Sequence, residues 1–479
     1  MARPRVLPPA AEEFSGADLG DGRLMVRLQK VANAIAAAPS DSFPQVVRSD
    51  SELEGVYRFL RNDRVSPDAI LAPHFEASRQ RASTSEVLVV HDTTDFTFGG
   101  WVPRDGLGRL KRVGGSQGFF GHFALAVAGD EGREPLGLLG LRTVVRTGRL
   151  LGRKVRGRDR TRRAEKESDR WMDLALDVHA KTPNAIHVMD READSFDVFH
   201  KLQSAAARFV IRMREGNIRV ADVDGQKVPI SGVVAVEPVL LTRTVPLSRR
   251  ISRGRKRDDK IHPPRAERTA KLQVRAATVT IPRPRYHRDR RSLPRSLIVN
   301  VVSVKEVGHP SYLTPVSWLL ATTEPVASVA QVERVIDAYR ARWMIEEFFK
   351  ALKTGCAYEK RQLESFHALV NALAIFAVIA WRLLLLRWMG RVQPDAPATD
   401  ALTSEQVRVL KTLSTMIEPG IPRIEMPSKP TAYDALLAVA RLGGHIKNNG
   451  PPGWQVLGRG YDSLLLLQTG WRARERCDR

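Results

Sequence analysis

The sequence predicts an α/β protein: a mixed sheet with covering helices and an inserted β-rich subdomain, flanked by helical N- and C-terminal domains. Strand-like runs rich in β-branched residues alternate with helical patterns between residues 86 and 214. A second strand-like region follows, and both ends of the chain show apolar residues at helical spacing. A chain of 479 residues also exceeds one ordinary core. We therefore expect domains at 1–70, 71–370 and 371–479, with the insertion at about 215–315.

The charge balance indicates a polyanionic partner. The chain has 76 Lys and Arg residues against 53 Asp and Glu residues, a formal net charge of +23. A surplus of this size is costly through self-repulsion unless a polyanion neutralises it. We expect nucleic acid as that partner. A generally basic composition is the alternative that charge alone leaves open.

Cysteine usage and hydropathy indicate an intracellular protein. Two cysteines, Cys356 and Cys477, are too few for a disulfide framework or a cysteine zinc site. The opening residues MARPRVLPPAAEEF contain no apolar run typical of a signal peptide. The most apolar stretch, which begins at Asn371, is interrupted by Arg382 and falls short of the ~20 apolar residues of a membrane span. We therefore expect a cytoplasmic protein with no membrane association and a buried helix at this stretch.

The first 70 residues predict a small helical module with a basic surface. Residues 21–38 have apolar residues at helical spacing, and residues 49–63 begin with capping-type side chains. The basic side chains of this segment are Arg23, Arg27, Lys30, Arg48, Arg58, Arg61 and Arg64. Such a module fits DNA binding.

The central region predicts the strand and helix order β-β-β-α-β-α-β. The strand-like runs are EVLVVHDTTDFTF, GFFGHFALAVAGD, PLGLLGLRTVVR, AIHVMD and RFVIRMR, and the two helical runs lie at residues 164–180 and 195–207. The inserted subdomain contains two very basic stretches, residues 249–259 and 283–295. We interpret these as disordered or DNA-contacting loops.

Residues 339–355, YRARWMIEEFFKALKTG, predict one helix with two different faces. At about 100° per residue, its polar residues form one stripe: Tyr339, Arg342, Glu346, Lys350 and Lys353. The opposite side is apolar: Ala341, Met344, Ile345, Phe348 and Leu352. The apolar side faces a core, so the polar stripe faces either water or a cleft.

Two carboxylates lie where strand-like runs end, Asp92 and Asp190, and Glu346 on the polar stripe can supply a third. Three converging carboxylates repel one another unless divalent cations lie between them, and hard oxygen ligands favour Mg²⁺ or Mn²⁺. Taken singly, Asp92 or Asp190 is as well explained as a turn former, and Glu346 as an ion-pair partner of Lys350. Asp194, which precedes a helix, fits an N-cap better than a metal ligand.

Together these residues resemble the bacterial cut-and-paste DDE transposases of the IS-four, transposon-Tn-five type. The motifs are DTT at Asp92, DREAD at Asp190, the Tyr-x₂-Arg-x₃-Glu-x₆-Lys spacing of Tyr339, Arg342, Glu346 and Lys353, and EKES at Glu165, with LGDGR, YRFLRN, WLLATTEPV and ARLGG elsewhere. The resemblance covers nearly the whole chain, apart from residues 99–118, which do not match the family's pattern. It implies a ribonuclease-H-like catalytic domain of the retroviral integrase superfamily, a DNA-end-binding domain and a C-terminal dimerisation domain.

The resemblance also implies roles for individual residues. Asp92, Asp190 and Glu346 would be the catalytic acids that hold two Mg²⁺ or Mn²⁺ ions. The implied DNA contacts are Tyr339, Arg342, Lys353, Lys350, Trp318, Arg27, Tyr57, Arg61, Arg212 and Arg214. Among these, Trp318 would stack a flipped base beside a hairpin, or would simply belong to a buried strand. Arg27, Tyr57 and Arg61 would either contact DNA or pack the module.

The implied activity is binding of transposon ends, cleavage of those ends and joining to target DNA. Double-stranded DNA would be the partner, and a homodimer would form in the DNA complex at the bacterial nucleoid. Two other functions stay open at this point. A ribonuclease-H-like nuclease would need the acids but not the Tyr, Arg and Lys signature. A DNA-binding regulator of transposition would need neither cleavage nor metal.

Overall fold

The structure is a computed structural model of the 479-residue chain. It describes residues 10–47, 49–83, 86–100, 102–110, 116–146, 167–214, 218–221, 226–247, 264–284, 292–310, 314–416, 423–446 and 450–477. The chain divides into two compact units. Unit 1 contains residues 1–87, 92–162 and 343–479, and unit 2 contains residues 88–91 and 163–342.

Unit 1 is mainly helical and carries one end of a sheet. Its helices are η1 (Ala10–Phe14), α1 (Gly22–Ala37), α2 (Phe43–Val46), α3 (Asp50–Arg61), α4 (Pro67–Ala82), α10 (Trp343–Lys350), the π-helical turn η3 (Ala351–Gly355), η4 (Tyr358–Lys360), α11 (Phe366–Val392), α12 (Ala398–Ala401), α13 (Ser404–Thr415), α14 (Ala432–Leu442) and α15 (Trp454–Cys477). Its strands are β2 (Gly108–Arg109), β3 (Gln117–Ala128), β4 (Pro135–Val144) and most of β1 (Val87–Phe98).

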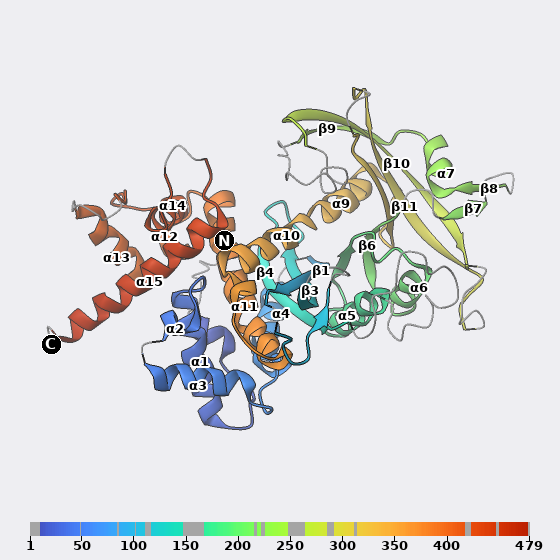
Figure 1. Ribbon diagram of the computed structural model, residues 1–479. Helices are drawn as coiled ribbons and strands as arrows, with labels where there is room; N and C mark the ends of the chain where they lie inside the picture. Colours follow the sequence, from blue (N-terminus) through green and yellow to red (C-terminus); the bar gives the residue numbers. More distant parts are fainter. Residues whose placement is uncertain are drawn as a thin grey trace. The chain divides into compact units, whose positions relative to one another are not determined.

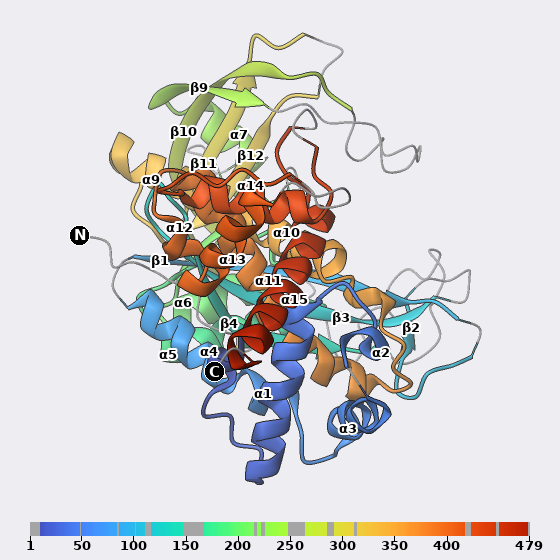
Figure 2. The ribbon, with the colours of Figure 1, turned by 90° about the vertical axis from the view of Figure 1, so that its left-hand side faces the viewer.

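Helix α11 is the centre of unit 1 (Figure 1). It packs against α3, α4, α14, η3 and β4, which bury it on all sides. Its length and apolar composition are sufficient for a membrane span, contrary to the sequence-based estimate, and its most apolar window is 100% buried inside the structure. The predicted buried helix is therefore confirmed. Helix α15 runs beside α1, and Ser40 Oγ donates a hydrogen bond of 3.0 Å to Asp462 of α15 (Figure 2).

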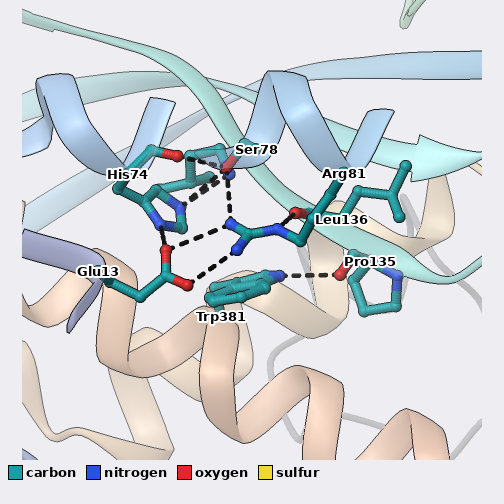
Figure 3. A network of polar contacts seen from close by, with 8 residues as sticks. Glu13, His74, Ser78, Arg81, Pro135, Leu136 and Trp381 are labelled. Carbon is teal, nitrogen blue, oxygen red and sulfur yellow. Dashed lines mark hydrogen bonds and ion pairs between the residues drawn. The ribbon is translucent and has the colours of Figure 1, made fainter. Parts of the chain in front are cut away.

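A buried polar network joins the N-terminal turn η1 to α4 and β4 (Figure 3). The Glu13 carboxylate accepts hydrogen bonds from Arg81 at 2.8 Å and from His74 Nδ1 at 2.5 Å. His74 Nε2 accepts the backbone N–H of Leu138 at 3.1 Å, so the imidazole is neutral with its proton on Nδ1. The Arg81 guanidinium also lies over the Trp381 ring of α11, 4.4 Å from its centroid. One network therefore connects four segments of unit 1.

Unit 2 contains the rest of the sheet and its covering helices. Its strands are residues 88–91 of β1, β5 (Ile186–Met189), β6 (Arg208–Arg212), β7 (Arg219–Ala221), β8 (Lys227–Pro229), β9 (Leu241–Leu247), β10 (Arg268–Pro282), β11 (Ser296–Val307) and β12 (Ser317–Thr322). Its helices are α5 (Glu167–Lys181), α6 (Phe196–Ser204), α7 (Ile230–Val236) and α9 (Val329–Arg340).

The described strands form a mixed sheet of ten, in the order β2-β3-β1-β5-β6-β12-β11-β10-β9 with β4 on β3. Strands β1, β5 and β6 are parallel. The antiparallel pairs are β2–β3, β3–β4, β6–β12, β12–β11, β11–β10 and β10–β9. Strands β10 and β11 form a long antiparallel ribbon (Figure 1). The predicted mixed sheet with covering helices is confirmed, and the predicted β-β-β-α-β-α-β order is observed with one additional short strand, β2.

The two faces of the unit 2 sheet carry different helices. His187 of β5 and Phe209 of β6 lie side by side, and their rings contact His179 of α5 and Phe199 of α6. Helices α5 and α6 therefore cover this face. Helix α9 packs on β5 and β6 from the other face. Its Tyr339 contacts Trp318 of β12. Trp318 lies on the same face as Leu320, which pairs with Arg212 of β6.

Three local predictions are wrong. Residues 339–355 are not one helix, because α9 ends at Arg340 and α10 begins at Trp343. Strand β1 does not end at Asp92 but continues to Phe98. The N-cap of α6 is Ser195, whose hydroxyl accepts the N–H of Val198, and not Asp194.

Some predicted features lie outside the described residues. These are the basic residues 249–259, most of the basic stretch 283–295, and the first two residues of the EKES motif, Glu165 and Lys166, together with the connector before them.

Candidate active site

One edge of the unit 2 sheet gathers predicted site residues from four elements. Asp190 directly follows β5, as predicted, and Arg212 is the last residue of β6. The last paired residues of these parallel strands are Met189 and Ile211, so Asp190 and Arg212 come next on the same face. The guanidinium of Arg212 donates a hydrogen bond of 2.9 Å to the carbonyl of Ser317, at the start of β12. This edge is the carboxyl end of the parallel strands, where sites in such sheets are usually built.

Trp318 and Tyr339 pack against each other at this edge. Their ring centroids are 5.3 Å apart with an interplanar angle of 66°. Trp318 is half-buried, whereas Tyr339 is 5% exposed. The Tyr339 ring thus supports the indole and does not project from a polar stripe. Arg342 follows in the turn between α9 and α10 and is half-buried.

Asp190 and Asp194 belong to the loop between β5 and α6 and have different environments. The Asp190 carboxylate accepts the backbone N–H of Glu192 at 2.7 Å and is half-buried. Asp194 accepts the backbone N–H of Arg214 at 2.8 Å, and burial raises its pKa above the ordinary value. Asp194 therefore fastens the end of β6 to this loop. Arg214 itself is exposed.

The other two predicted acids, Asp92 and Glu346, belong to unit 1. Asp92 is the sixth of the twelve residues of β1 and is half-buried, and its carboxylate accepts the N–H of Thr93 at 2.8 Å. Glu346 lies in the first turn of α10 and is also half-buried. The apolar side of α10 is buried through Ile345 and Phe348, as the helical pattern predicted. Glu346 is thus held on a helix with a fixed orientation.

Lys353 and Lys350 have acidic partners within unit 1. Lys353 Nζ contacts the carbonyl of Asp95 and lies 3.4 Å from its carboxylate and 3.7 Å from that of Glu359. Lys350 pairs with Glu347 at 2.6 Å and lies 5.6 Å from the centroid of the Trp343 ring. The sequence suggested Glu346 as the ion-pair partner of Lys350, whereas the structure pairs Lys350 with the next residue, Glu347.

The N-terminal residues divide between packing and exposure. The guanidinium of Arg27 lies directly against Gly55 of α3, where an added Cβ would be 2.7 Å from it. The Tyr57 ring packs edge-on against Phe43, with 6.0 Å between centroids. Arg61 is half exposed and pairs with Glu364 at 2.7 Å. Arg27 and Tyr57 are thus half-buried and make contacts within the module, and Arg61 is the most exposed of the three.

Carboxylate oxygens are the donors that hard divalent cations take, so the chemistry of the three acids fits Mg²⁺ or Mn²⁺. In the part of the chain that the structure describes, no three Asp, Glu, His or Cys side chains are grouped so that they could hold a metal ion. Two of the acids belong to unit 1 and one to unit 2. The metal site therefore stays a proposal, which is developed below.

Two segments of the chain match known protein families. Residues 158–382 match the transposase DDE domain, and residues 9–65 match a transposase DNA-binding domain. The two matches support a DDE transposase. They support a metal-dependent DNA-cutting enzyme with DNA as its partner, and the mixed sheet with helical regions on both sides is consistent with the ribonuclease-H-like fold of such an enzyme. Asp190 and Glu346 lie inside the segment that matches the transposase DDE domain, whereas Asp92 precedes it.

Two features of the structure were not predicted from the sequence. His91 and His187, which lie on β1 and β5, are fully buried and hydrogen-bonded to each other at 2.9 Å. Trp343 at the start of α10 is 59% exposed, an unusual state for an indole. The available signals were a histidine one residue before Asp92, a histidine three residues before Asp190, and a tryptophan directly after Arg342.

Proposed function

We propose that this transposase is of the IS-four, transposon-Tn-five type and that it binds transposon ends, cleaves them and joins the 3′ ends to target DNA. Asp92, Asp190 and Glu346 are the proposed catalytic acids. The proposed domains are an end-binding domain at 1–70, a catalytic domain at 71–370 and a dimerisation domain at 371–479. Cleavage through a hairpin intermediate and action in the bacterial cytoplasm belong to the same proposal.

The register of β1 and β5 is the observation that carries this proposal. In these parallel strands Leu88 lies opposite Ile186, and Val90 lies opposite Val188. Asp92 and Asp190 each follow two residues later, and side chains two residues apart on a strand share a face. The register therefore supports Asp190 as a site residue on the face that α9 covers, and Asp92 shares the face of Val90 on its own strand.

The residues would have different roles in phosphodiester cleavage: metal binding, phosphate binding and base stacking. Two divalent cations held by the three acids would supply the charge that activates the attacking oxygen and stabilises the leaving one. Arg212 and Arg342 offer guanidinium groups for phosphate oxygens. Trp318, held edge-on by Tyr339, offers an indole face on which an unpaired base can stack.

The basic surfaces would hold the DNA on either side of this site. Arg61 and Arg214 are the more exposed of the arginines considered, and Lys350 is exposed on α10. Lys353 is already engaged with Asp95 and Glu359, so it would have to exchange those partners for a phosphate. A homodimer in the DNA complex would bring one set of acids to each transposon end.

The experiment uses the purified full-length chain, Mg²⁺ and a linear DNA that carries the inverted repeats flanking the gene. Asp92→Asn, Asp190→Asn and Glu346→Gln should each abolish cleavage and leave end binding intact, because each removes a metal ligand without changing side-chain volume. Glu192→Gln, an exposed acid in the same loop as Asp190, is the matched control and should cleave normally.

Normal Mg²⁺-dependent cleavage by any one of the three variants would overturn the assignment of that acid. Denaturing gels of the same reactions report a hairpin as a product that migrates at twice the length of the end strand. Light scattering of the protein bound to end DNA reports two chains per complex if the homodimer is correct, and one chain if it is not.

A further inference from the structure

The strand pair that carries Asp190 contains a polar contact in its buried core. His91 Nε2 and His187 Nδ1 are 2.9 Å apart, both rings are 0% exposed, and the ring planes are inclined by 31°. Both residues belong to unit 2 and lie on the face that α5 covers, opposite to the face of Asp190. This imidazole pair therefore lies directly behind the proposed site.

The pair shares one proton between its two facing nitrogens. An N···N hydrogen bond needs one protonated and one unprotonated nitrogen. Either ring can be the donor, because a neutral imidazole carries its proton on Nδ1 or on Nε2. Each histidine therefore supplies one half of the same contact.

A polar pair at this position can fix the register of β1 and β5, whereas an apolar pair cannot. Strand β5 has four residues, and its paired neighbours on β1 are Leu88, Val89 and Val90. Such aliphatic side chains would pack almost as well after a slip of the strands along each other, and a slip of one residue turns every side chain to the opposite face. The hydrogen bond between the two imidazoles forms in one register only. A polar group in an apolar core is a known means of fixing register.

We propose that the His91–His187 hydrogen bond fixes the register of β1 and β5, and that both histidines are positioning residues for metal binding by Asp190. The inference rests on the proposed function, because it concerns the geometry of one of the proposed acids. The histidines do not touch the metal, since they lie on the opposite face of the sheet.

The test measures binding of Mn²⁺ alone to the full chain, by electron paramagnetic resonance of the free ion, together with the midpoint of thermal unfolding. His187→Leu and His91→Leu remove the hydrogen bond and should weaken Mn²⁺ binding about tenfold, the equivalent of one net hydrogen bond. His187→Asn keeps an amide that can donate or accept a hydrogen bond at the position of Nδ1, and it should bind Mn²⁺ within about threefold of the unmodified chain. The double variant should bind no more weakly than either single variant, because both remove the same contact.

His179→Leu is the matched control. His179 contacts the ring of His187 but bonds to the carbonyl of Ala205 at 2.8 Å, so its loss should lower the unfolding midpoint without changing Mn²⁺ binding. If His187→Leu does not fold, His91→Leu carries the same comparison.

Unchanged Mn²⁺ binding in both leucine variants would overturn the inference, and so would an equal loss in His179→Leu. Asp190→Asn separates this failure from a failure of the proposed function. If Asp190→Asn binds Mn²⁺ as tightly as the unmodified chain, the acids are not the metal site and the proposed function itself is wrong.

Discussion

Replacing Glu13 by Gln should destabilise unit 1 substantially at neutral pH. Burial alone would raise the pKa of Glu13, but the hydrogen bond from His74 and the charge and hydrogen bonds of Arg81 outweigh it and lower the pKa from 4.5 to about 2. A shift of about 2.5 units corresponds to about 3 kcal/mol. Removing one partner from a buried ion pair costs a similar amount, about 3 to 5 kcal/mol. The two routes therefore agree on the size of the effect.

The pH dependence of this effect has a definite sign. A depressed carboxylate pKa stabilises the folded state above the unfolded value of 4.5, and this contribution disappears as the pH falls through about 2. Urea unfolding at pH 7 should show Glu13→Gln about 3 kcal/mol less stable than the unmodified chain, with the difference shrinking between pH 4.5 and pH 2. Glu76→Gln, which breaks an exposed pair with Arg79 in α4, is the control and should change stability by less than about 1 kcal/mol. A loss below about 1 kcal/mol at pH 7 for Glu13→Gln, or a loss that grows on acidification, would refute this account of the network.

Three further changes have expected outcomes in thermal unfolding. Gly137→Ala should destabilise by more than about 2 kcal/mol, because residue 137 has φ +132° and an added Cβ would lie 2.0 Å from Ser78 Oγ; unchanged unfolding would contradict this. Asp462→Asn should stabilise the folded state by about 2 kcal/mol at pH 8 and should leave its stability unchanged near pH 4. Burial raises the pKa of Asp462 to about 8, so the unmodified chain loses stability as the pH rises from 3.8. A stability difference that does not change with pH would contradict this prediction. Arg361→Lys should cost about 2 kcal/mol, because the guanidinium donates from Nη1 to the carbonyl of Asp41 and from Nη2 to the carbonyls of Ser40 and Cys356, and one ammonium nitrogen cannot occupy both positions; a lysine variant of normal stability would exclude that role.

Much of the sheet could be predicted because its local patterns agree with its tertiary environment. Strand β5 reads as a short apolar run that ends in Asp190, and the structure buries Ile186 to Met189 and ends the strand there. The sequence predicts that β1 ends at Asp92, because polar residues follow it. Its second half alternates instead, with Phe96 and Phe98 buried and Asp95 and Thr97 partly exposed, so it continues as a half-buried strand.

The break between α9 and α10 could not be predicted in the same way. Residues 339–343 contain neither Gly nor Pro, and their helical spacing continues through the break. The structure ends α9 at Arg340, where the N–H of Ala341 bonds to the carbonyls of Asp337 and Ala338, and the division between the two units falls between Arg342 and Trp343. The break therefore depends on long-range packing. For this reason the signature residues do not form one stripe, although the spacing identified them as a set.

Contacts between distant segments were likewise absent from the sequence signal. His91 and His187 are 96 residues apart, and their pairing follows only from the register of two parallel strands. Lys353 was expected as a phosphate ligand from its spacing, but nothing in the helical pattern indicated Asp95 and Glu359 as its neighbours. Sequence spacing predicts which side chains share a face of one element, whereas neighbours from other elements require the fold.

The buried network around Glu13 has a consequence for how the DNA-binding domain could be exchanged between related proteins. The carboxylate lies within residues 9–65, which match the transposase DNA-binding domain, whereas His74 and Arg81 lie after that segment. A chimaera that takes only the first 65 residues from another protein would leave an arginine and a neutral imidazole facing whatever the donor sequence supplies at position 13. Exchanging this segment would therefore require the graft to extend through α4, or to keep an acid at that one position.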